Sequence, residues 1–169
     1  RSTLFPYTTL FRSPYSLHGG FLHLLFNMLY LWIFGNNVED AMGHVRFVVF
    51  YVLCGVVAVF AQALPDPDST IPMVGASGAI SGVLGAYMLL YPHARVLLGL
   101  PVGFFIFQLG RFPAVWVLAS WFLLQLVSNQ FAAEGGGVAF RAHIGGFVAG
   151  VAFIALFKRR DVQLWRPKR

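Results

Sequence analysis

A serine and a histidine that lie far apart in this 169-residue chain could together perform acyl-transfer chemistry. Ser77 lies in Gly75-Ala76-Ser77-Gly78, and His143 lies in Ala142-His143-Ile144-Gly145-Gly146. A serine hydroxyl becomes a nucleophile when a base within about 2.6–3.2 Å takes its proton. Ser77 could instead be a helix N-cap or a small packing residue, and it lacks a Gly-x-Ser-x-Gly elbow because Ala79 occupies the last position. The pair can react only if the fold brings both side chains together.

Two further polar residues, His23 and Asn27, could stabilise the negative charge that such a reaction creates. They are four residues apart and therefore share one face of a helix. Asparagine side chains donate hydrogen bonds to developing oxyanions in hydrolases. A structural hydrogen bond between two helices is the alternative role for the same residues.

The histidines could also suggest a metal site, but their pattern disfavours one. His18 and His23 are five residues apart, which turns them away from a common helix face. No Cys, Asp or Glu is expected at the same depth to complete a coordination sphere. We therefore expect no metal and no other cofactor.

The elements that must position these residues are membrane helices. The chain is 58% hydrophobic and 11% charged, whereas an ordinary soluble domain has about 25% charged residues. Asp, Glu, Lys and Arg are absent from five long stretches, 13–38, 47–65, 69–94, 112–133 and 142–157. A membrane-spanning helix needs about 20 mostly apolar residues. The composition excludes a soluble domain, a disordered chain and a nucleic-acid-binding module, and it predicts an all-α, polytopic membrane helical bundle.

The expected spans follow these charge-free stretches and lie near 21–35, 47–64, 77–91, 114–130 and 139–157. A polar turn is expected at 36–40, after the first span. The apolar stretch 96–110 is interrupted by Gly99, Pro101 and Gly103, and we expect it to be interfacial or re-entrant rather than spanning.

Basic residues are distributed unequally between the two sides of this layout. Arg46, Arg95, Arg111 and the basic residues of the C-terminal tail lie on one side, and Arg141 lies on the other. The positive-inside rule makes the first side cytoplasmic. The lipid bilayer is thus the expected environment, with the C-terminal tail in the cytoplasm.

The layout also places the unusual polar residues at one depth. The first, third and fifth spans run in the same direction, so their first residues lie beneath the same outer surface. His23 and Asn27, Ser77 and His143 are near those three starts. Small residues recur every fourth position in Ser77-Ser81-Gly85 and at Gly146 and Gly150, a spacing that lets two membrane helices approach closely.

Taken together, these motifs resemble the rhomboid family of intramembrane serine proteases. The segments that carry the resemblance are His18-Gly-Gly-Phe-Leu-His23-Leu-Leu-Phe-Asn27, Gly75-Ala76-Ser77-Gly78 and Ala142-His143-Ile144-Gly145-Gly146, with Gly35-Asn-Asn-Val-Glu39-Asp and Trp121-Phe122-x-x-Gln125 in support. The resemblance covers nearly everything from about Tyr15 to Phe157.

The resemblance implies a role for each matching residue. Ser77 would be the nucleophile and His143 the general base. Asn27 and His23 would line the oxyanion hole with the Ser77 backbone N–H. His18 would be structural at the helix entrance, and Gly75, Gly78 and Gly146 would be structural near the site. Substrates would be transmembrane segments of other proteins, cut near the outer surface.

The chain is expected to consist of three parts. Residues 1–13 resemble translated sequencing-adapter read-through, 14–157 form the rhomboid-like membrane domain, and 158–169 form a basic cytoplasmic tail. The family's first transmembrane helix is expected to be missing, which leaves five spans of six. No acidic residue is expected beside His143, so a Ser–His dyad is predicted rather than a triad. A bacterial cytoplasmic membrane is expected, with the active site open to the outer side.

Three hypotheses of different classes follow. The first is an active intramembrane serine endopeptidase, and the second is a non-catalytic rhomboid-like protein that binds transmembrane helices. A transporter is the weakest, because no inverted repeat or buried carboxylate supports it. The active endopeptidase is favoured by the joint presence of Ser77, His143, Asn27 and His23, since a binding protein needs none of them.

The first hypothesis also requires access to the site. Water must reach it, so a cavity open to the outer side is expected. The Gly135–Gly137 loop would cover that cavity. Aromatic residues of the fourth span, Trp116, Trp121 and Phe122, would form a gate for the substrate.

Overall fold

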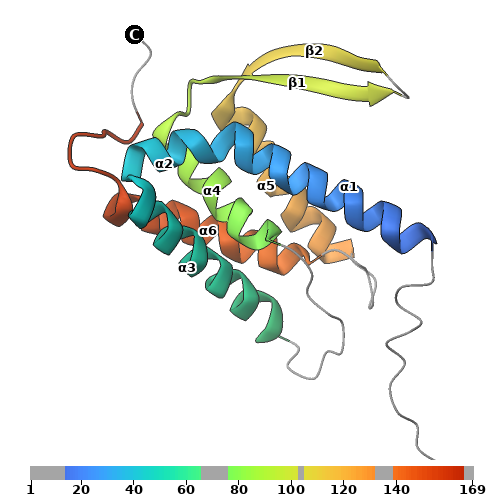
Figure 1. Cartoon of the computed structure of the whole chain (residues 1–169), viewed down its shortest axis with the longest axis horizontal. Coiled ribbons are helices and arrows are strands. Elements are labelled where there is room, and N and C mark those ends of the chain that lie inside the picture. The colour runs from blue at the N-terminus through green and yellow to red at the C-terminus, as the bar shows by residue number, and fades with distance from the viewer. Residues whose placement is uncertain (1–13, 66–75, 103–104, 132–138, 166–169) are drawn as a thin grey trace, which may run out of the picture.

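The computed structural model describes residues 14–65, 76–102, 105–131 and 139–165, and the side chains of 20–65, 76–99, 107–131 and 139–165. The described elements are helices α1 (Pro14–Tyr30), η2 (Leu31–Gly35), α2 (Asn36–Met42), α3 (His44–Ala63), α4 (Ser77–Leu90), α5 (Ala114–Phe131) and α6 (Phe140–Phe157), and strands β1 (Arg95–Val102) and β2 (Phe105–Pro113). The chain is thus a mainly helical bundle with one hairpin outside it (Figure 1).

Four described helical segments are long and apolar enough to cross a membrane, namely Gly20–Met42, His44–Ala63, Ala114–Phe131 and Phe140–Phe157. The third predicted span, α4, is apolar but has only 14 residues. A helix of that length rises about 21 Å, less than the roughly 30 Å hydrocarbon core of a bilayer. Its short length is tolerated because the other helices surround it, and every residue from Gly78 to Tyr87 is buried.

The first membrane helix is longer than the sequence predicted. The expected turn at 36–40 is wrong, because α1, η2 and α2 follow one another without a break and the helix ends at Met42. The polar residues between 36 and 40 lie within this helix and do not end it. The chain reverses at Gly43, whose φ of 89° suits glycine. His44 Nδ1 lies 2.6 Å from Glu39 Oε1 across that break.

Helices α4 and α6 pack so closely that their backbones touch. A Cβ built on Gly146 would overlap the carbonyl oxygen of Gly78, and one built on Gly150 would overlap that of Gly82. The close approach expected from the spacing of small residues is therefore confirmed, since only glycine fits at these two positions of α6.

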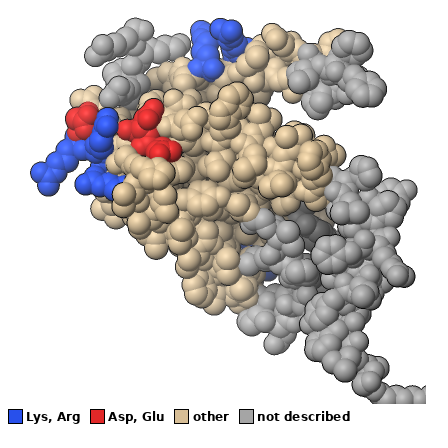
Figure 2. Space-filling model, in the orientation of Figure 1, with Lys and Arg blue, Asp and Glu red and all other residues tan. Residues whose placement is uncertain are grey.

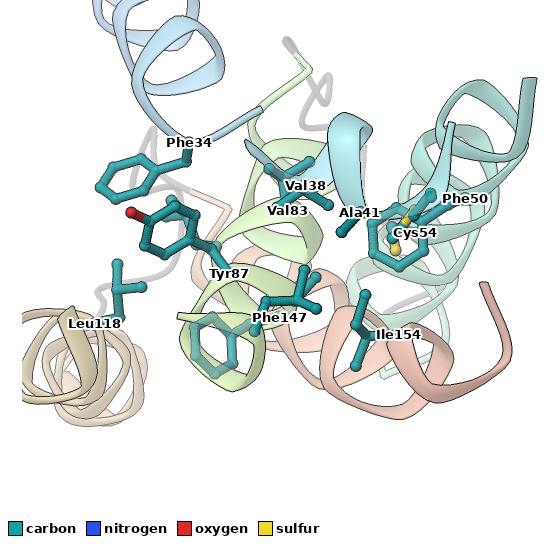
Figure 3. Close-up of a cluster of buried hydrophobic side chains, with 14 of the residues drawn as sticks. Phe34, Val38, Ala41, Phe50, Cys54, Val83, Tyr87, Leu118, Phe147 and Ile154 are labelled. Carbon is teal, nitrogen blue, oxygen red and sulfur yellow. The ribbon is translucent and has the colours of Figure 1, made fainter. Parts of the chain in front are cut away.

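A hydrophobic cluster joins this helix pair to the rest of the bundle (Figure 3). It includes Phe34 of η2, Val38 and Ala41 of α2, Phe50 and Cys54 of α3, Val83 and Tyr87 of α4, Leu118 of α5, and Phe147 and Ile154 of α6. Phe34 and Tyr87 meet edge to face with ring centroids 4.9 Å apart. Phe34 lies in the π-helical turn η2, and its side chain packs in this cluster.

The stretch between α4 and α5 forms an antiparallel hairpin, which the sequence did not predict. Strand β1 pairs with β2 from Arg95↔Pro113 to Val102↔Phe105, with an irregularity between Leu98 and Gly99. Gly99 and Pro101 disfavour a helix here, while the apolar and aromatic residues around them suit a strand. The hairpin extends outside the helical bundle (Figure 1), and both of its strands contact α5. An interfacial or re-entrant position for it stays a prediction.

Most of the described charged side chains gather at one end of the molecule and on the hairpin, as Figure 2 shows, whereas Arg141 lies at the start of α6. The segment after α6 folds back over that end. The Arg159 N–H donates to the carbonyl of Ala41 at 2.8 Å, and the Trp165 N–H donates to that of Leu89 at 2.8 Å. The first residues of the basic tail are therefore docked on α2 and α4.

Candidate active site

Ser77 and His143 meet at the opposite end of the bundle from the docked tail. Ser77 is the first residue of α4, and His143 is in the first turn of α6. His143 Nε2 lies 2.9 Å from Ser77 Oγ, and the contact is partly buried. Gly78 follows Ser77, and Gly146 lies one turn after His143. The backbone contact between these two glycines permits the short distance between Ser77 and His143.

Local hydrogen bonds fix the starts of both helices. Ser81 Oγ donates to the Ser77 carbonyl at 2.7 Å within the first turn of α4. The Ala142 N–H, one of the first N–H groups of α6, donates to Gln62 Oε1 of α3 at 3.2 Å. Gln62 thus ties the first turn of α6, and with it His143, to the neighbouring helix.

The second ring nitrogen of His143 has a partner that the sequence analysis did not assign. His143 Nδ1 lies 2.9 Å from Gln125 Oε1 of α5. Gln125 is buried, at 7% exposure. One sequence feature could have indicated this residue. Gln125 is a polar residue in the middle of the charge-free stretch 112–133, within Trp121-Phe122-x-x-Gln125.

An aromatic cluster adjoins the same histidine through Trp121. The rings of Trp121 and His143 are 6.0 Å apart between centroids, and Trp121 also lies 6.1 Å from Phe147. Phe122 stacks on Phe147 at 4.5 Å. Two of the three predicted gate residues therefore pack against α6, whereas Trp116 is exposed.

The other two candidate residues lie on α1 and differ in exposure. Asn27 is buried, at 9% exposure, and His23 is exposed. Among the described hydrogen bonds, none joins either side chain to Ser77 or His143. Their membership of an oxyanion hole stays a prediction.

Some predicted features fall outside what the structure describes. The side chain of His18, the residue Gly75 and the loop Gly135–Gly137 lie outside the described residues. Two described cavities, of about 410 and 290 Å³, have walls that include neither Ser77 nor His143. A water-filled cavity at the site stays a prediction.

The described residues offer no site for a metal. Within the described ranges, no three His, Cys, Asp or Glu side chains come close enough to hold one. The site instead contains the hydroxyl of Ser77 and the imidazole of His143. The amide of Gln125 and the indole of Trp121 lie beside the imidazole. This set is suited to proton transfer and nucleophilic attack.

Comparison with known proteins gives consistent matches. The family model for the Rhomboid domain matches residues 7–160. Rhomboid protein 1, mitochondrial, of Saccharomyces cerevisiae is 33% identical over 142 residues, covering 80% of this chain and 38% of the yeast protein. The putative rhomboid protease YdcA of Bacillus subtilis is 34% identical over 87 residues, covering 52% of this chain and 43% of that protein.

Rhomboid protease GlpG of Haemophilus influenzae is 28% identical over 135 residues, covering 80% of this chain and 62% of that protein. The chain thus spans less than two thirds of the length of each of these three relatives. No solved structure matches the chain.

Proposed function

Because this chain belongs to the rhomboid family, we propose that it is an intramembrane serine endopeptidase that uses Ser77 and His143. The observation that carries the proposal is the 2.9 Å contact between Ser77 Oγ and His143 Nε2. The two residues are on different helices of an apolar bundle. An ionisable group such as His143 is costly within a membrane helix, so its presence there favours a functional role. Relatives named as rhomboid proteases support the reaction class.

The proposed reaction proceeds through an acyl-enzyme. As Ser77 Oγ attacks the carbonyl carbon of a peptide bond, His143 Nε2 takes the hydroxyl proton. His143 then gives that proton to the leaving amine, the C–N bond breaks, and an ester to Ser77 remains. Water, deprotonated by His143, hydrolyses the ester and restores the serine.

The oxyanion formed during attack needs hydrogen-bond donors. The backbone N–H of Ser77 lies at the start of α4, where the helix dipole favours negative charge. Asn27 and His23 of α1 are the proposed side-chain donors. Such donors act strongly in a site of low dielectric constant because they are already oriented before the charge develops.

The proposed substrates are transmembrane segments of other proteins. The candidate site lies at the end of the bundle away from the described tail residues Lys158, Arg159 and Arg160. By the positive-inside rule, that tail is cytoplasmic and the site faces the other side of the membrane. The proposed location is a bacterial cytoplasmic membrane.

Cleavage of a reporter transmembrane substrate in proteoliposomes tests the proposal. Ser77→Ala and His143→Ala should each abolish product formation, because one removes the nucleophile and the other removes its base. Ser120→Ala is the matched control, since Ser120 is an exposed membrane-helix serine whose hydroxyl bonds the Val117 carbonyl of its own helix. Its rate should equal that of the unmodified protein. Cleavage by Ser77→Ala at the unmodified rate would show that the nucleophile is another group.

A further inference from the structure

We propose that Gln125 is a positioning residue that holds His143 in the one tautomer able to accept the Ser77 proton. This inference rests on the proposed function and adds a third residue to its chemistry. It starts from the two edges of the His143 ring, each of which has one partner. Nε2 is 2.9 Å from Ser77 Oγ, and Nδ1 is 2.9 Å from Gln125 Oε1.

The chemistry of the amide decides which nitrogen carries the proton. The carbonyl oxygen of a glutamine side chain only accepts hydrogen bonds. With Gln125 Oε1 facing it, His143 Nδ1 must therefore be the N–H donor. In a neutral imidazole the other nitrogen, Nε2, is then the acceptor, and it points at the Ser77 hydroxyl. A base with this tautomer is ready to take the serine proton.

The place of Gln125 in α5 allows it to hold the ring still. Its side chain is buried at 7% exposure, on the same helix face as the buried residues Ala114 and Leu118. One turn earlier, Trp121 packs against the His143 ring at 6.0 Å. Helix α5 therefore contacts the histidine in two places, at Nδ1 through Gln125 and at the ring through Trp121.

A neutral partner fits this position better than an acid. Among the described residues, no Asp or Glu side chain bonds to His143, and α5 carries no charged residue between Ala114 and Phe131. A carboxylate within an apolar bundle has a large desolvation cost. An amide orients the ring at a smaller cost, but it cannot offset the positive charge of the imidazolium as an acid would.

Two substitutions that nearly conserve the size of the side chain distinguish the effect of losing the hydrogen-bond acceptor from the effect of changing the volume. Gln125→Met removes the acceptor and should lower kcat for a reporter transmembrane substrate about 10- to 100-fold, by analogy with losing the partner that orients a metal-bound histidine. KM should stay unchanged, because Gln125 is not proposed to contact the substrate. Gln125→Glu, which burial in the apolar bundle should keep protonated and neutral, retains a carbonyl acceptor and should keep more activity than Gln125→Met.

The control is Gln130→Met, the same change at an exposed position of the same helix. It should leave both constants unchanged. If Gln125→Met has the kcat of the unmodified protein, or if Gln125→Glu is no better than Gln125→Met, the proposal is wrong.

Nitrogen-15 NMR of histidine-labelled protein in nanodiscs provides a measurement that does not depend on activity. His143, assigned by its loss in His143→Ala, should show a protonated Nδ1 and an unprotonated Nε2. Gln125→Met should shift the population towards the other tautomer. An Nε2–H form in the unmodified protein would overturn the role of Gln125. Absent cleavage together with the expected tautomer would instead overturn the proposed protease function alone.

Discussion

At the scale of single residues, burial distinguishes the two candidate donors to the oxyanion. Asn27 is 9% exposed, while His23, one turn earlier on α1, is exposed. A hydrogen bond to a developing charge is stronger where water is excluded. Asn27 should therefore contribute more to the transition state than His23 does.

Replacing Asn27 by Ala should lower kcat about 100- to 1000-fold, the effect of removing one donor from an oxyanion hole. His23→Ala should lower it less. Asn37→Ala is the control, because Asn37 is an exposed asparagine at the far end of the same continuous helix. Steady-state cleavage of a reporter substrate measures all three. A larger loss from His23→Ala than from Asn27→Ala would reverse the assignment.

The contact between Ser77 and His143 followed from the sequence, but the contact with Gln125 did not. The direction of each span fixes the depth of its first residues, and small residues indicate which helices approach closely. Which residue of α5 faces His143 depends on the rotation of that helix about its axis. Residues 114–131 are apolar on every side, so the sequence carries little information about that rotation.

At the scale of elements, the backbone contact between α4 and α6 sets the distance between nucleophile and base. Gly146 lies one turn after His143 and touches the backbone at Gly78, the residue after Ser77. A methyl group at Gly146 would meet a carbonyl oxygen, which cannot move aside as a flexible side chain can. The two helices would have to separate.

Gly146→Ala should therefore destabilise the protein by about 1–3 kcal/mol, the usual cost of overpacking, and reduce cleavage. Gly20→Ala is the control, since a Cβ at Gly20 of α1 has no atom within 4 Å. Thermal unfolding in detergent and the cleavage rate should both distinguish the two variants. Equal stability and activity in Gly146→Ala and Gly20→Ala would show that the close contact is not needed.

The elements also show where sequence patterns stop being informative. Charge-free stretches located the membrane helices because lipid excludes charge. The same signal could not show that the first helix continues to Met42, since polar residues outside the apolar core are compatible with either a helix or a turn. It could not show the β1–β2 hairpin either, because apolar residues broken by Gly99 and Pro101 have no helical or strand period over a long window.

At the scale of the whole molecule, charge predicts the orientation in the membrane. Most described basic residues lie near α2, on the hairpin or in the segment after α6, away from the candidate site, whereas Arg141 is two residues before His143. A basic end is retained in the cytoplasm during insertion. The end that carries Ser77 and His143 should then face outwards.

Single cysteines in a Cys54→Ala background would measure this orientation. Asp161→Cys replaces an acid whose side chain is 73% exposed, in the segment after α6, and it should be protected from a membrane-impermeant maleimide in intact cells. Gln130→Cys, at the exposed far end of α5, should be labelled from outside. The opposite labelling pattern would place the candidate site on the cytoplasmic side.

The most direct measurement of the central claim is covalent labelling by a fluorophosphonate probe, which reacts with activated serines. In the membrane-embedded protein, peptide mapping should find the adduct on Ser77, and His143→Ala should prevent its formation although the variant remains folded. An adduct on a different serine, or equal labelling of Ser77 in His143→Ala, would contradict a nucleophile activated by the histidine 2.9 Å away.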